Sequence, residues 1–151
     1  MKNKFGFTLI ELLISMTIGM LVVGFGTMAL NNFNEQQKVE MTKQELLANL
    51  RLARNYATTN QLAPGGDRIT VNISAGGIIE AITQYENSDI GNSFFSKDIT
   101  PDGVNISASA ISFNGTEGRS IDGTLTIVIS GDGDDLDRTI KIDESGLIYE
   151  E

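Results

Sequence analysis

The spacing of hydrophobic and polar residues changes twice along the chain. Residues 7–30, FTLIELLISMTIGMLVVGFGTMAL, form an apolar run in which Glu11 is the only charged side chain. As an α-helix this run would be about 36 Å long, enough to cross a hydrocarbon core of about 30 Å. A buried helix of a soluble protein is usually shorter and carries a polar stripe, which this run lacks. The pattern therefore predicts a transmembrane helix.

The helical pattern continues past the apolar run in an amphipathic form. Residues 31–61 are rich in Glu, Gln, Lys, Leu and Ala, and their apolar side chains recur on one face at helical spacing: Val39, Leu46, Leu50, Ala53 and Ala57. This stripe predicts packing against a sheet, with a coiled-coil partner as the alternative. The sequence Pro64-Gly65-Gly66 is expected to end the helix.

Beyond the helix the apolar side chains alternate with a period of two. This alternation predicts strands over residues 68–75, 77–85, 104–113, 124–130, 138–143 and 147–150. In the third of these the alternation shifts between Ala110 and Ile111, which predicts a bulge or a break. Residues 86–102 have weak periodicity and are expected to form a surface loop. Short strands separated by Gly, Asn and Asp predict antiparallel sheet, and the whole chain an α+β fold.

Composition narrows the function. The chain of 151 residues has a formal net charge of −9, and residues 61–151 contain 16 acidic against 5 basic side chains. An acidic surface repels phosphate backbones, so nucleic acid is an unfavourable partner. There is no Cys and no His, which excludes disulfides and thiol catalysis and removes the commonest general base and catalytic metal ligand. The sequence therefore predicts a protein that is not an enzyme.

The residues around the apolar run predict its orientation. Lys2 and Lys4 precede the run, whereas acidic and basic residues are balanced after it, which places the N-terminus in the cytoplasm and the rest of the chain outside. A cleaved secretory signal is the disfavoured alternative, because its apolar core is typically about 7–15 residues and ends in an A-x-A-like site. Residues 27–29 are the only weak candidate for such a site.

Glu11 is the anomaly of this run. A carboxylate at the centre of a membrane helix costs about 2.5–3.5 kcal/mol on insertion scales, and less near an end. One interpretation is that Glu11 reaches the cytoplasmic interface and has no further role. The other is that Glu11 has a cationic partner within the membrane.

The residues on either side of Glu11 favour a partner. The short basic leader, Gly6 and then FTLIELL at residues 7–13 closely resemble the type IV prepilin signature, which pilins share with the pseudopilins of type II secretion. The resemblance implies cleavage between Gly6 and Phe7 by a prepilin peptidase, followed by N-methylation of Phe7. It also implies a type IV pilin-like fold, in which residues 1–6 are the leader, 7–30 the transmembrane assembly helix, 31–61 its amphipathic half and 62–151 an extracytoplasmic β-rich domain.

The resemblance also gives Glu11 an assembly role. Cleavage would create an α-amino cation on Phe7, and the Glu11 carboxylate of one subunit would meet the amine of its neighbour in the filament. Each charge buried alone would be costly, whereas the pair is tolerated. Gly19, Gly24 and Gly26 predict close helix packing. By the same resemblance, the alternative is local loosening of the helix in the filament, at Gly19 and Gly24.

A second resemblance concerns the later residues. Residues 45–57, ELLANLRLARNYA, and the later segments 111–115 and 145–148 are similar to the H-type minor pseudopilins, the GspH/FimT group. This similarity implies a minor pseudopilin of a type II secretion system in the inner membrane, acting in assembly initiation or at the filament tip. Implied partners are other pilin or pseudopilin subunits, an inner-membrane platform protein and an assembly ATPase. The alternative is a minor type IV or competence pilin in adhesion or DNA uptake, although the distal acidity argues against DNA.

One acidic segment is a candidate metal-binding site. Residues 131–137, GDGDDLD, are rich in oxygen ligands, which suit calcium, and the candidate ligands are Asp132, Asp134, Asp135 and Asp137. The segment departs from the EF-hand pattern, which requires a glycine at the sixth position, where this chain has Asp137. The alternative is an acidic hairpin turn without metal. No other cofactor is expected.

Overall fold

The computed structural model describes residues 7–59, 62, 64–85, 90–132 and 136–150. This part of the chain forms one α-helix and eight strands: α1 (Leu9–Thr58), β1 (Arg68–Ile73), β2 (Ile78–Gln84), β3 (Ile90–Asp98), β4 (Val104–Ile106), β5 (Ser109–Asn114), β6 (Leu125–Gly131), β7 (Arg138–Ile142) and β8 (Ile148–Glu150). The chain divides into two compact units, residues 1–34 and 35–151.

The first unit contains the apolar part of α1. Its large hydrophobic side chains are all exposed along residues 7–33, and no tertiary core covers them. The helix is long and apolar enough to cross a membrane. The apolar run therefore forms the helix that the sequence predicts. Its exposed hydrophobic surface suits the hydrocarbon core of a membrane.

The second unit is built around the later part of α1. The predicted stripe is confirmed, because Val39, Leu46, Leu50, Ala53 and Ala57 are each at most 1% exposed. The buried face is broader than the stripe and also includes Thr42, Lys43 and Leu47. It packs against strands, as the sequence predicts. The helix ends at Thr58, close to the predicted end, and residues 60–61 lie outside the described residues.

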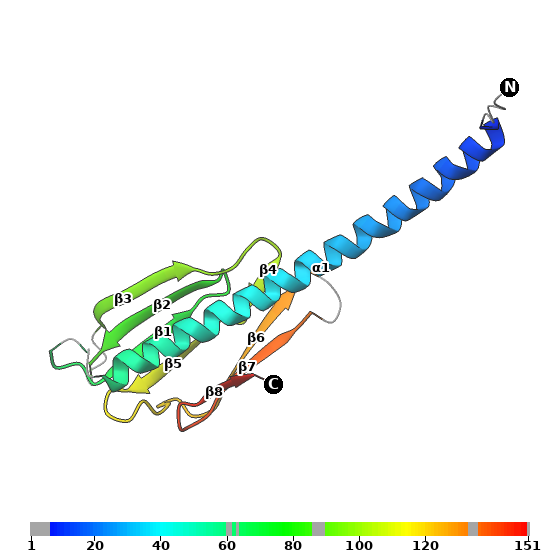
Figure 1. Cartoon of the computed structure of the whole chain (residues 1–151). Helices are drawn as coiled ribbons and strands as arrows, with labels where there is room; N and C mark the ends of the chain where they lie inside the picture. The colour runs from blue at the N-terminus through cyan, green and yellow to red at the C-terminus, as the bar shows by residue number, and fades with distance from the viewer. Residues whose placement is uncertain (1–6, 60–61, 63, 86–89, 133–135, 151) are drawn as a thin grey trace. The chain divides into compact units, whose positions relative to one another are not determined.

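Two antiparallel sheets complete the second unit. The first has the strand order β3-β2-β1-β5 and the second β4-β6-β7-β8. Ile69, Val71 and Ile73 of β1 face inward, as the alternation predicts. Both sheets and α1 contribute to one hydrophobic core, and Figure 1 shows the later part of α1 lying across the strands. The α+β fold, a long N-terminal helix packed on antiparallel sheets, is confirmed and is consistent with the type IV pilin fold.

The prediction for residues 104–113 was wrong in one respect. These residues form two strands rather than one, and the two strands belong to different sheets: β4 pairs with β6, and β5 pairs with β1. The break lies at residues 107–108, a few positions before the predicted shift at Ala110 and Ile111. The alternation changes because each strand turns its apolar side chains toward the core from its own sheet.

The loop predicted at residues 86–102 was also wrong, because β3 runs through it as an edge strand beside β2. Two irregularities in the pairing interrupt its period. Ala81 pairs with Phe95 but Ile82 pairs with Ser93, which leaves Phe94 as the extra residue of a bulge. Phe94 and Phe95 are both half-buried and pack against the core, and two adjacent aromatics of this kind remove the alternation that would have indicated a strand.

Candidate functional site

The start of α1 places Glu11 in a local hydrogen-bond arrangement. Thr8 precedes the first helical residue, Leu9, and its hydroxyl oxygen accepts a hydrogen bond from the backbone N–H of Glu11 at 3.3 Å. Thr8-x-x-Glu11 therefore has the spacing of a capping box, in which an N-cap hydroxyl binds the N3 amide. Glu11 also lies in the first turn, where the helix dipole favours a negative charge. The Thr8-x-x-Glu11 spacing is a sequence signal for this cap.

The other polar side chains of the apolar run bond to the helix itself. The hydroxyls of Ser15, Thr17 and Thr27 donate to backbone carbonyls three or four residues earlier, at 2.7–3.0 Å. Such bonds satisfy a hydroxyl within the helix, so it needs no partner from outside. Glu11 differs, because the described residues offer its carboxylate no cation.

The expected processing site lies at the edge of the described chain. Gly6 lies outside the described residues, and Phe7 directly precedes Thr8 with 81% of its surface exposed. The helix is continuous through Gly19, Gly24 and Gly26, and a Cβ at any of these glycines would meet nothing within 4 Å. No packing among the residues that the structure describes requires these glycines.

A buried lysine links α1 to the last strand. The Nζ of Lys43 lies 2.8 Å from a carboxylate oxygen of Glu40 and 2.8 Å from one of Glu150. Burial lowers the pKa of Lys43, but the hydrogen bonds to Glu150 and Glu40 outweigh burial, so its pKa is raised overall. The Lys43 hydrogen bond lowers the pKa of Glu40, helped by a bond from Gln44. The ion pairs of Lys43 with Glu40 and Glu150 therefore fix β8 to the helix.

A second junction lies nearer the end of the helix. The Arg54 side chain donates to the carbonyl oxygens of Gly118 at 3.1 Å and Ser145 at 3.3 Å, and so joins α1 to two loops. Gly146, at φ 75°, lies so close that a Cβ there would be 2.0 Å from the Gly118 oxygen. Arg54 does not belong to the apolar stripe of α1, and its spacing along the helix indicates no contact. Its role depends on loops about 64 and 91 residues away, which local spacing does not indicate.

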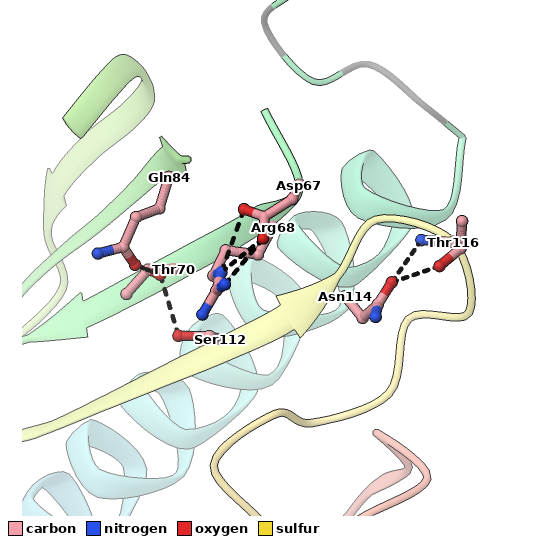
Figure 2. Close-up of polar contacts among 7 residues, drawn as sticks. All are labelled: Asp67, Arg68, Thr70, Gln84, Ser112, Asn114 and Thr116. Atoms are coloured by element: carbon pink, nitrogen blue, oxygen red, sulfur yellow. Dashed lines mark hydrogen bonds and ion pairs between the residues drawn. The ribbon is translucent and has the colours of Figure 1, made fainter. Parts of the chain in front are cut away.

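Polar side chains gather on the first sheet where β1 lies between β2 and β5 (Figure 2). The Thr70 hydroxyl donates to Gln84 at 2.7 Å and lies 3.0 Å from the hydroxyl of Ser112, which is thus the donor of that second bond. Beside them, a bidentate contact from Arg68 holds the pKa of Asp67 below its usual value. The polar groups of this cluster therefore find hydrogen-bond or ion-pair partners among themselves.

An open depression of about 450 Å³ adjoins this polar cluster, lined by Leu62, Gly66, Asp67, Arg68, Asn114, Gly115, Thr116 and Ile121. The Asn114 side-chain oxygen accepts bonds from the backbone N–H and the hydroxyl of Thr116, which closes one wall of the depression (Figure 2). No nucleophile–base pair lines it. The depression therefore offers no catalytic arrangement.

The candidate calcium segment is only partly described. Within this segment Asp132 and Asp137 are exposed, whereas Asp134 and Asp135 lie outside the described residues. Among the residues that the structure describes, no group of three or more acidic, His or Cys side chains is close enough to hold a metal ion. Calcium binding by these four aspartates stays a prediction.

Comparison with known proteins gives one match. The family described as the prokaryotic N-terminal methylation motif matches residues 1–27, a range that contains Gly6, Phe7 and Glu11. No curated protein and no solved structure matches the chain. The motif supports a type IV pilin-like subunit, a structural protein rather than an enzyme. It implies processing by a prepilin peptidase and assembly with other pilins, and together with the apolar helix it indicates membrane anchoring and incorporation into a pilus.

Proposed function

We propose that the chain is a prepilin, cut between Gly6 and Phe7 and methylated on the new amine of Phe7. The observation that carries this proposal is the methylation motif across residues 1–27. The mature chain would then consist of a transmembrane assembly helix at residues 7–30, its amphipathic continuation at 31–61 and a β-rich domain at 62–151. Lys2 and Lys4 favour an N-terminus in the cytoplasm and a domain outside the inner membrane.

Glu11 would pair with the Phe7 amine of a neighbouring subunit. Its carboxylate has no cation among the described residues, and the surrounding side chains are apolar and exposed. Removing one member of a buried ion pair leaves an uncompensated charge, which costs about 3–5 kcal/mol. The pair would therefore fix the axial register between neighbouring helices in the filament.

The filament would be a type II secretion pseudopilus, with the chain as a minor component that initiates assembly or forms the tip. The similarity of residues 45–57, 111–115 and 145–148 to H-type minor pseudopilins supports this choice. Arg54 from the first segment donates a hydrogen bond to the carbonyl oxygen of Ser145 in the third, so these two segments meet in one junction. Platform protein and assembly ATPase would be further partners. A minor type IV or competence pilin is the second candidate, and the acidic domain disfavours its DNA-uptake form.

Processing and pairing are tested in a host that carries the complete assembly system. The N-terminal peptide of assembled protein should begin with a methylated Phe7, and Gly6→Leu should abolish the cut. Glu11→Ala should leave membrane insertion intact and reduce incorporation into filaments at least about tenfold. The matched control is Glu35→Ala, which removes a carboxylate from the same helix beyond the apolar run. Normal incorporation of the Glu11 variant would refute the pairing.

The choice between filaments is tested by deleting the gene and measuring two functions separately. Loss of exoprotein release with intact transformation and adhesion supports the pseudopilus. Loss of transformation or adhesion with intact release refutes it and supports the second candidate.

A further inference from the structure

The turn after β5 contains the only Asn-Gly pair of the sequence, Asn114-Gly115. A Cβ on residue 115 would lie 2.9 Å from the carbonyl oxygen of Asp67 and still closer to the side chain of Leu62, so only glycine fits there. The side-chain oxygen of Asn114 accepts hydrogen bonds from the backbone N–H and the hydroxyl of Thr116, at 2.7 and 2.5 Å (Figure 2). The fold therefore places a glycine directly after a turn-forming asparagine.

An Asn-Gly pair can lose ammonia without an enzyme. The backbone nitrogen of the glycine gives up its proton to solvent and attacks Cγ of the asparagine, so that an N–Cγ bond forms, the Cγ–Nδ2 bond breaks and ammonia leaves. Water then opens the cyclic imide at either of its carbonyls, which produces aspartate or isoaspartate. Glycine favours the attack, because a residue without a Cβ lets the two groups approach closely.

The folded chain holds both reacting groups away from this reaction. The backbone N–H of Gly115 donates to the carbonyl oxygen of Asp67 at 2.9 Å, which holds the proton that the nitrogen must lose. The two hydrogen bonds from Thr116 hold the side chain that the nitrogen must reach. Asn114 and Gly115 are also half-buried. Attack therefore requires the turn to open, by a local motion that leaves the rest of the domain folded.

We propose that Asn114 is a site of spontaneous deamidation, and that the hydrogen bonds of this turn block the reaction while the turn is closed. Loss of ammonia makes the change irreversible, so each opening of the turn can leave a permanent mark. Isoaspartate would lengthen the main chain at the end of β5, where Asn114 pairs with Arg68 of β1, and the strand could not return to its register. This property of the folded domain goes beyond the proposed function and does not depend on it.

The test follows residue 114 in purified full-length protein kept in detergent at neutral pH. Mass spectrometry of peptides that contain residue 114 measures the conversion to aspartate and isoaspartate over time. We expect it to be at least about tenfold slower in the folded chain than in the same chain unfolded in guanidinium chloride.

Thr116→Val tests the gate itself, because Thr116 is exposed and the substitution removes its hydroxyl without opening a core cavity. It should raise the rate in the folded chain at least about fivefold, equivalent to about 1 kcal/mol, the net contribution of one hydrogen bond. The rate in the unfolded chain should not change. Thr116→Ser keeps the hydroxyl and should keep the protection of the wild type.

The matched control is Thr100→Val. Thr100 donates its backbone N–H and its hydroxyl to Asp98, two residues earlier, so the same substitution removes the same kind of bond from another turn. It should leave the rate at Asn114 unchanged, and circular dichroism shows that each variant is folded.

Three results would overturn the proposal. Equal rates in folded and unfolded wild-type protein would show that the turn gives no protection. An unchanged or lower rate in Thr116→Val would show that the Thr116 donors do not block the attack. An equal rise in Thr100→Val would show that the overall stability of the domain, and not this turn, controls the reaction.

Discussion

Lys43 provides the sharpest test of how the folded domain is held together. Its side chain is 8% exposed and contacts two carboxylates, whose own side chains are 46% and 45% exposed. Lys43→Met keeps the volume of the aliphatic chain and removes the charge. Removing one partner of a fully buried ion pair costs about 3–5 kcal/mol. Because Glu40 and Glu150 are half-exposed and rehydrate once Lys43 is gone, we expect a smaller loss of about 1–2 kcal/mol.

The assay is thermal unfolding of the full chain in detergent, followed by the circular dichroism of its strands. A loss of about 1–2 kcal/mol corresponds to a decrease in Tm of about 3–10 °C for a domain of this size. The control is Lys97→Met, because Lys97 also pairs with a glutamate of α1, Glu45, but is 59% exposed. That substitution should cost less than about 1 kcal/mol. Equal effects of the two substitutions, or a rise in Tm for Lys43→Met, would refute the reasoning.

Three further predictions concern the same unfolding transition. Gly146→Ala adds a Cβ at 2.0 Å from a backbone oxygen and should cost more than about 2 kcal/mol, whereas Gly123→Ala, also at positive φ but in open space, should cost about 1 kcal/mol. Leu50→Ala should cost about 2–5 kcal/mol, and Leu52→Ala, 39% exposed, clearly less. The pKa of Glu40 is lowered from 4.5 by folding, so stability should fall as the pH drops below 4.5 through its folded pKa. Glu40→Gln should flatten that part of the pH profile.

Local spacing predicted the elements whose burial is regular. The stripe of α1 and the alternation of β1 depend only on which side of an element faces the core, and that information is present in neighbouring residues. β3 was missed because its pairing slips beside Ala81, so that Phe94 and Phe95 both pack inward and the period of two disappears. Phe94 also stacks on Tyr56 of the helix, with ring centroids 5.2 Å apart, a contact that holds an irregular edge strand without alternation.

The candidate site likewise has one part that the sequence identifies and one part that only the folded chain shows. The prepilin signature is contiguous, so residues 6–11 could be identified from sequence alone, and the methylation motif covers them. The contacts of Arg54 and Lys43 could not be predicted, because each joins α1 to a segment at least 64 residues away. Sequence spacing indicates that Lys43 lies near the buried stripe. Only the folded chain shows that Glu150 reaches it.

The hydrogen bond between Thr8 and Glu11 separates two explanations of why Glu11 is needed. In the first, Glu11 acts within one subunit, as the N3 residue of a helix whose dipole favours an acid there, worth about 0.3–1 kcal/mol. In the second, proposed above, its charge meets the amine of a neighbour. Thr8→Val removes the cap and keeps the carboxylate, whereas Glu11→Gln keeps the N3 amide and removes the charge.

If the contact between subunits dominates, Glu11→Gln should abolish most incorporation into filaments. Thr8→Val should reduce incorporation less than about threefold. A lost cap costs only about 0.5–2 kcal/mol, and assembled and free subunits both bear that cost. Quantitative blotting of sheared filaments against total membranes measures both effects. Equal impairment by the two substitutions would show that Glu11 acts through the start of its own helix. Glu11 would then have its full effect within a single unassembled subunit. The cut after Gly6 would be needed to expose the end of the helix and not to create a partner charge.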